Sequence, residues 1–149
     1  MKKNTLISLS LFVLLVFAQI EAFACTCITD TDITYEQSIK FNLKNAKAVF
    51  TGKVLEVADI FQSNDVNVKI QVDKIWKGNL SKFVVITTSR FSSACGYKFE
   101  KGKSYLVFAR TFEKSGLKTH LCLPNREIIK AGQELKILGK ALKPKKKKI

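Results

Sequence analysis

The sequence is poor in the residues on which metal binding and acid–base catalysis usually depend. Its 149 residues include one histidine, two prolines and seven glycines. The lone histidine, His120, cannot build a histidine-based metal or catalytic cluster. It alternates with Leu117, Thr119 and Leu121 in a predicted strand, so we expect it to face solvent. No glycine-rich phosphate loop is present, and no pattern places serine, histidine and aspartate as a triad. We therefore expect no enzymatic activity and no cofactor.

Acidic residues are also scarce, and the rest of the composition is that of a basic globular protein. Twelve aspartates and glutamates stand against 26 lysines and arginines, which gives a net charge of +14 and a pI near 9.8. Hydrophobic residues make up 46% of the chain, enough for a packed core rather than a disordered polymer. The few prolines and glycines exclude collagen-like and proline-rich fibres. The length fits one domain.

The only long apolar run lies near the start of the chain. A short basic stretch precedes an almost continuously apolar sequence at 6–20, and Ala22-Phe23-Ala24 follows. This order is typical of a secretory signal over residues 1–24, with cleavage before Cys25. The apolar run is shorter than the roughly 20 residues of a membrane-spanning helix. We expect a secreted or periplasmic product. Acylation of Cys25 in a lipoprotein is a minor alternative, because Ala22 and Phe23 fit that signal poorly.

Four cysteines lie after the predicted cleavage site, at Cys25, Cys27, Cys95 and Cys122. An even count in an exported chain favours two disulfides. A bond between Cys25 and Cys27 would close a small strained ring. Both remaining pairings tie the Cys-x-Cys segment to two distant parts of the chain. A zinc site is the competing interpretation, but this spacing is not usual for zinc ligands.

Hydrophobic periodicity predicts five strands and two helices. Thr34 and Gln37 form a capping-box pattern at the start of the first helix, and Gly52 is expected to mark a β-bulge. Trp76 is expected to be a packing residue. The predicted helices cover 34–46 and 126–142, and the strands cover 49–60, 66–76, 83–88, 105–112 and 117–122. Such a set suits a mainly β, five-stranded Greek-key barrel of the OB type with two flanking helices.

The first mature residues, Cys25-Thr26-Cys27, resemble the start of the tissue inhibitors of metalloproteinases (TIMPs), whose N-terminal netrin-like (NTR) domain begins Cys-x-Cys. A Cys-Gly pair about 70 residues later and another cysteine about 25 residues beyond it strengthen the resemblance. Further segments similar to the family are residues 48–54, 74–78, 93–97 and 116–122. The chain is similar to single-domain bacterial members, with an NTR/TIMP-like domain at 25–142.

The resemblance implies an OB-type barrel with disulfides Cys25–Cys95 and Cys27–Cys122. It also implies that the free amine and carbonyl of Cys25 chelate the catalytic zinc of a target metalloendopeptidase. Thr26 would enter the pocket beside the scissile position, and Ser93, Ala94 and Cys95 would form the adjoining contact ridge. Other NTR domains are not inhibitors. A non-inhibitory binding module at the cell surface or in the periplasm is therefore the alternative function.

The chain ends in a lysine-rich tail at 143–149. Such a tail suits an anionic glycan or membrane surface, although a solvated end is the simpler interpretation. OB folds also bind single-stranded nucleic acid with basic grooves and aromatic platforms. Export and disulfides argue against that role here. We expect a monomer whose main partner is a zinc metalloendopeptidase.

Overall fold

A computed structural model describes residues 25–27, 32–111 and 116–142. The predicted signal segment, 1–24, and the lysine-rich tail, 143–149, lie outside these residues. The described part is mainly β. No helix within it is long and apolar enough to cross a bilayer.

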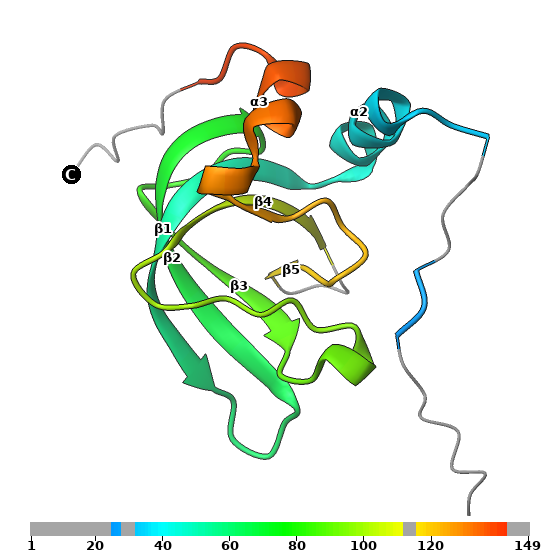
Figure 1. The fold of residues 1–149 in the computed structure, drawn as a ribbon. Helices are drawn as coiled ribbons and strands as arrows, with labels where there is room; N and C mark the ends of the chain where they lie inside the picture. Colours follow the sequence, from blue (N-terminus) through cyan, green and yellow to red (C-terminus); the bar gives the residue numbers. More distant parts are fainter. Residues whose placement is uncertain (1–24, 28–31, 112–115, 143–149) are drawn as a thin grey trace, which may run out of the picture.

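A six-stranded sheet forms most of the molecule (Figure 1). Its strands are β1 (Ala48–Asp59), β2 (Asp65–Lys77), β3 (Phe83–Ser89), β4 (Ser104–Thr111), β5 (Leu117–Lys118) and β6 (Arg126–Glu127). The helices are α2 (Tyr35–Asn45) and α3 (Gly132–Leu138), with short 3₁₀ turns η1 (Ser92–Ala94) and η2 (Ile128–Lys130). The first four strands match the predicted ones to within one residue at each end.

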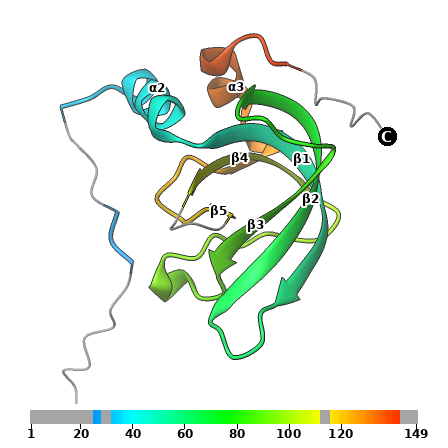
Figure 2. The same cartoon turned by 180° about the vertical axis from the view of Figure 1, so that it is seen from behind.

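Five of the strands are hydrogen-bonded in a ring. The order β1-β2-β3-β5-β4 is closed by an antiparallel pairing of β4 with β1, and β6 adds to the outer side of β4. The β3–β5 contact is parallel and joins only Ile86 with Leu117 and Thr87 with Lys118. Figure 2 shows the opposite side of this ring, with the long curved strands β1 and β2 passing around it.

Local sequence explains where β1 bends and where α2 begins. Thr34 caps α2, since its Oγ1 accepts from the Gln37 N–H while the Gln37 side chain accepts from the Thr34 N–H, as predicted. The β1–β2 register shifts between Thr51 and Gly52, which confirms the expected bulge. A β-carbon at position 52 would collide with the Gln71 carbonyl oxygen and lie 2.6 Å from Ile70 Cγ2, so only glycine fits there.

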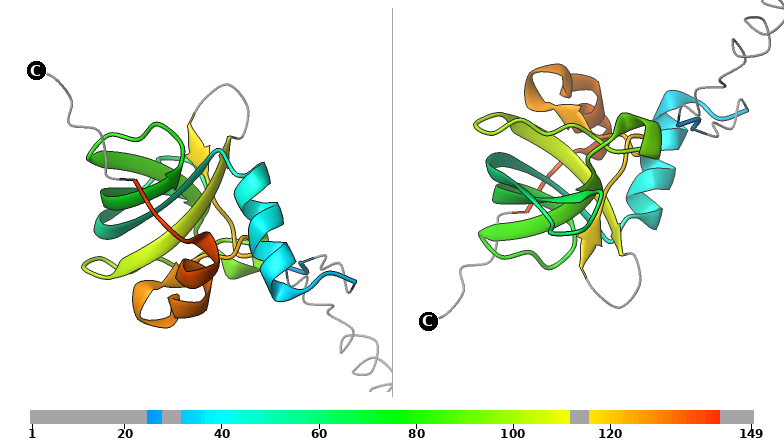
Figure 3. Two further views of the ribbon diagram at one scale, coloured as in Figure 1. Left: turned by 90° about the horizontal axis from the view of Figure 1, so that it is seen from above. Right: turned by 90° about the horizontal axis from the view of Figure 1, so that it is seen from below.

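Two hydrophobic clusters lie on the two sides of β1 and β4. Alternation along β4 sends Tyr105 and Val107 to one cluster and Leu106 and Phe108 to the other. The first fills the ring, where Phe50, Ile70 and Ile86 are among its fully buried members. The second lies beneath the helices and includes Ile39, Leu43, Trp76 and Leu135. Figure 3 shows α2 and α3 side by side against this flank of the sheet.

A buried carboxylate links the two helices. Glu134 is 2% exposed, accepts a short hydrogen bond from the Tyr35 hydroxyl and lies 2.8 Å from Arg126 Nε. Burial acts to raise the pKa of Glu134, but the hydrogen bonds from Tyr35 and Arg126 outweigh it and lower this pKa. The charged form is therefore the one that the fold accommodates.

The C-terminal predictions were partly wrong. The expected helix at 126–142 is instead β6, η2 and the seven-residue α3, and Leu142 then forms an isolated bridge with Ile75. Glu134 and Ala131 are buried, while Ile129 is 80% exposed, so the apolar spacing did not follow one helical face. The expected strand at 117–122 ends at Lys118. Beyond it the backbone makes isolated hydrogen bonds, from the Thr119 N–H to the Thr87 carbonyl and from the Leu121 N–H to the Cys95 carbonyl.

Candidate functional site

Two disulfides fix the Cys-x-Cys segment on the barrel. Cys25 bonds to Cys95 and Cys27 to Cys122, with Cα–Cα distances of 5.0 and 5.3 Å. This is the pairing that the family resemblance implies. The bonds pack against each other, since Cys25 Sγ lies 3.8 Å from Cys122 Sγ. A three-residue segment is thus tied down at its first and last positions, and Thr26 between them is exposed.

The sulfur atoms of Cys25, Cys27 and Cys122 lie within 4.8 Å of one another, a spacing that could suit a metal ion. A cysteine binds zinc as a thiolate, however, and all four cysteines are oxidised to disulfides here. The zinc alternative considered for the cysteine spacing therefore does not fit the residues as they are paired.

The segment that carries Cys95 is a tight turn after β3. The Phe91 carbonyl accepts hydrogen bonds from the N–H groups of Ala94 (3.1 Å) and Gly96 (2.9 Å). Cys95 has a left-handed φ of 59°, which reverses the chain after η1. A side chain at Gly96 would collide with the Ser89 carbonyl oxygen, so glycine lets the turn close against β3. Ser93 and Ala94 are exposed on its outer side.

The segment that carries Cys122 is held by one buried amide. Asn125 Oδ1 accepts from the Phe108 N–H at 2.8 Å, and its Nδ2 donates to Thr119 Oγ1 at 2.8 Å and to the His120 carbonyl at 3.0 Å. Thr119 Oγ1 in turn donates to the Phe108 carbonyl at 2.7 Å. These side chains satisfy the β4 backbone where β5 has ended.

A backbone hydrogen bond joins the two cysteine-bearing segments directly, because the Leu121 N–H donates to the Cys95 carbonyl at 2.8 Å. All six residues predicted for protease contact therefore gather around the two disulfides. Thr26, Ser93 and Ala94 are exposed, and the three cysteines among them are half-buried. Two apolar side chains adjoin this group, Phe91 and Leu121, with 48% and 43% of their surfaces exposed.

The prediction that His120 faces solvent was wrong. His120 is half-buried, and its Nδ1 accepts from the Cys122 N–H at 3.3 Å. Burial, together with the charge of nearby Arg110, lowers the pKa of His120. The alternation argument failed because β5 ends before His120, so the strand period no longer applies there.

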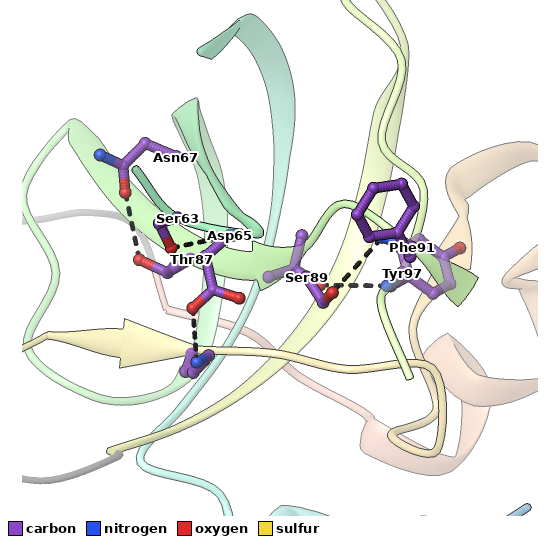
Figure 4. A network of polar contacts seen from close by, with 9 residues as sticks. Ser63, Asp65, Asn67, Thr87, Ser89, Phe91 and Tyr97 are labelled. Carbon is purple, nitrogen blue, oxygen red and sulfur yellow. Dashed lines mark hydrogen bonds and ion pairs between the residues drawn. The ribbon is translucent and has the colours of Figure 1, made fainter. Parts of the chain in front are cut away.

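A cleft of about 400 Å³ lies beside the Cys95 turn. Its walls come from the start of β2, the end of β3, the end of β4 and the residues around β5; the lining residues used below are Asp65, Ala94, Cys95, Arg110, Lys118 and His120. Figure 4 shows polar contacts along its β2–β3 side. There the Ser63 Oγ accepts from the Asp65 N–H, the Thr87 hydroxyl bonds to Asn67 Oδ1, and Ser89 Oγ accepts from the Phe91 N–H.

Sequence reasoning did not identify this cleft. Arg110 and Lys118 are eight positions apart in the sequence and become neighbours only through the pairing of β4 with β5, while Asp65 reaches Lys118 from β2. No local motif joins these three residues. One indication of it was present in the sequence, because Arg110 and Lys118 lie in two predicted strands that follow each other along the chain.

No protein-family model matches the chain, and a comparison with curated proteins finds no significant match.

Proposed function

We propose that the mature chain is a secreted or periplasmic TIMP-like inhibitor of zinc metalloendopeptidases, built on an OB-type NTR-like barrel. The observation that carries the proposal is the double clamp on Cys25-Thr26-Cys27, in which two adjacent disulfides hold an exposed residue between them. The five-stranded ring with a parallel β3–β5 contact supports the OB assignment.

The chemistry of the proposal lies in the backbone of Cys25. A catalytic zinc keeps one coordination position for water. After cleavage before Cys25, the α-amino nitrogen and the carbonyl oxygen of this residue would together form a five-membered chelate in place of that water. An α-amino group has a pKa of about 7.7–8.0, so a substantial fraction is neutral near pH 7.5. A lysine amine, with a pKa of about 10.4, is a much poorer donor there.

Rigidity makes this terminus a better ligand. A free chain end would lose conformational entropy on binding, at a cost of roughly 1–2 kcal/mol for each residue ordered. Here the disulfides to Cys95 and Cys122 restrict Cys25 and Cys27 before any partner is met. The exposed Thr26 side chain would enter the pocket beside the scissile position, where its hydroxyl can meet the general-base carboxylate of the protease.

The surrounding surface supports a protein partner. Ser93 and Ala94 are exposed next to Cys95, and Phe91 and Leu121 add apolar area at the same place. Apolar side chains within a polar rim are typical of protein-binding patches. The lysine-rich tail would add a separate, salt-sensitive attraction to anionic glycans or membrane surfaces.

Adding a single alanine before Cys25 tests the chelation directly. It converts the amine to an amide and places a residue where the zinc would lie, so inhibition should weaken by at least about 100-fold, or ~2.7 kcal/mol. Mature protein with a verified N-terminus is assayed against a panel of zinc endopeptidases. The matched control carries the same alanine after Ile149 and should inhibit like the unmodified protein.

Salt dependence separates the terminus from the tail. Binding through the tail should weaken in high salt, whereas inhibition by Cys25 should persist. Full inhibition by the extended protein would refute chelation. A folded protein with both disulfides that inhibits no member of the panel would favour the alternative, a non-inhibitory NTR-type binding module.

A further inference from the structure

The cleft beside the Cys95 turn contains a cation, Arg110, that no carboxylate of the described residues neutralises. Arg110 and Lys118 lie directly opposite each other in the antiparallel β4–β5 pair, where like charges are unfavourable. Lys118 Nζ lies 2.6 Å from Asp65 Oδ2. Arg110 has no such partner, because no carboxylate of the described residues lies within 4.0 Å of its guanidinium.

The hydrogen bonding of Arg110 is also incomplete. Its one side-chain contact within the described part of the chain is from Nη2 to Asn42 Oδ1, at 3.4 Å. Its Nε is buried and has no hydrogen-bond partner among the same residues. A guanidinium offers five N–H donors in a planar fork, and leaving a buried donor unsatisfied is unfavourable. The guanidinium lines the cleft without a carboxylate beside it among the described residues, and this leaves a place there for an acceptor with negative charge.

The cleft has the size and charge for one carboxylate. Its volume of about 400 Å³ falls within the range of small-molecule sites. Arg110 and Lys118 contribute two positive charges and Asp65 one negative charge, while burial and Arg110 favour the neutral form of His120. Among these described lining residues the positive charges outnumber the negative one, which favours an anion as the ligand. Asp65 would repel the second charge of a phosphate dianion, and a carboxylate matches the guanidinium fork.

We propose that this cleft is a carboxylate-binding site in which Arg110 is the principal contact and Ala94 and Cys95 form the neighbouring wall. The carboxylate belongs either to a free small acid or to the C-terminus of a peptide, which the guanidinium would recognise in the same way. The cleft shares Ala94 and Cys95 with the proposed contact surface but does not use the amine of Cys25, so the inference does not depend on protease inhibition.

Binding is measured by NMR on the full mature, disulfide-bonded protein labelled with ¹⁵N. The probes are acetate, N-acetylglycine and its neutral isostere N-acetylglycinamide, followed by one tripeptide with a free or an amidated C-terminus. The reporters are the amide groups of Thr111, Thr119 and His120, which line the cleft. Constant pH and ionic strength keep the charge of His120 and electrostatic screening unchanged across the series.

Three variants separate a specific site from general basicity. Arg110→Gln removes the guanidinium from the cleft, and Arg110→Lys keeps the charge without the fork. Arg90→Gln is the matched control, because it removes the same charge from an arginine that pairs with Asp59 and does not line the cleft. Intact mass and dispersed amide spectra confirm that each variant is folded and oxidised.

We expect saturable shifts with N-acetylglycine in the wild type and in Arg90→Gln, and none with N-acetylglycinamide. Affinity should fall by roughly tenfold or more in Arg110→Gln and by less in Arg110→Lys. Tighter binding of the free-acid tripeptide than of acetate would support a peptide terminus, and equal binding a small free acid. Shifts that do not saturate, that persist in Arg110→Gln, or that the neutral amide reproduces would overturn the proposal.

Discussion

The β1–β2 hairpin and the segment from Thr119 to Asn125 are held in the molecule by different interactions. The hairpin is paired along its whole length, from Val49 with Lys77 to Asp59 with Val66, and it buries apolar side chains on the inside of the ring. The 119–125 segment has no strand of its own. It is held by the Asn125 amide, the Thr119 hydroxyl and the Cys27–Cys122 disulfide, together with isolated backbone hydrogen bonds to Thr87 and Cys95.

The difference shows how one small domain supports an irregular surface. Hydrophobic burial is non-directional and stabilises the ring without specifying the shape of its loops. Disulfides and buried side-chain hydrogen bonds are directional, so they can hold a segment with little regular backbone pairing in one conformation. The proposed contact surface around Cys25 and the proposed carboxylate cleft both lie next to the 119–125 segment, which is held by directional interactions.

Removing the Cys27–Cys122 disulfide should give the largest effect. The bond closes a loop of 95 residues, so Cys27→Ala with Cys122→Ala should lower the free energy of unfolding by about 4 kcal/mol in the chain-entropy model. Urea denaturation measures the loss. Amide hydrogen exchange should show that protection falls at residues 119–125. Protection of the amides in the β1–β2 hairpin should fall much less. A uniform fall across both regions would contradict the separation drawn here.

Asn125→Ala should have the next largest effect. It removes three hydrogen bonds from a residue that is 6% exposed and leaves the Phe108 N–H without its acceptor, which should cost about 3 kcal/mol. Thermal or urea unfolding with both disulfides intact gives the value. Asn67→Ala is the matched control, because Asn67 is exposed and makes one side-chain contact, with Thr87. If both variants lost equal stability, the amide would not be the element that holds this segment.

The smallest expected effect is on the pKa of His120, and it is confined to the neighbourhood of that side chain. Burial and the charge of Arg110 place its pKa below the ordinary 6.5, so Arg110→Gln should raise it toward that value. Between the lowered pKa and 6.5 the unfolded state binds more protons. The free energy of unfolding therefore falls as the pH drops through this window. The chemical shifts of the imidazole protons in a ¹H NMR titration give the pKa of His120 in the wild type and in Arg110→Gln. An unchanged pKa in Arg110→Gln would remove Arg110 as a cause.

Much of the barrel was predictable because its signals are local. Val66, Val68 and Ile70 alternate with polar residues and face inward in β2, and the Thr34 capping pattern begins α2 as expected. The C-terminal half was less predictable. In the 126–142 region, the apolar residues belong in turn to a short strand, a 3₁₀ turn and a short helix. Their spacing along the sequence nevertheless matched the period of a single helix.

The candidate site divides in the same way. The gathering of Cys25, Thr26, Cys27 and the Cys95 turn was predicted from the disulfide pairing that a family resemblance implied, and the structure has that pairing. The cleft around Arg110 was not foreseen, because its lining residues come from five parts of the chain. The burial of His120 was missed for a related reason, since it depends on where β5 stops.

By itself, the sequence determined the features encoded over a few residues: a basic chain with four cysteines, the alternation of the long strands, the bulge at Gly52 and the cap of α2. Only the tertiary structure decided that β5 is two residues long, that Asn125 replaces the missing ladder and that Arg110 lies opposite Lys118. These features depend on contacts between segments that are distant in the sequence. Packing and the pairing of buried hydrogen-bonding groups in the folded protein decide which of these contacts form.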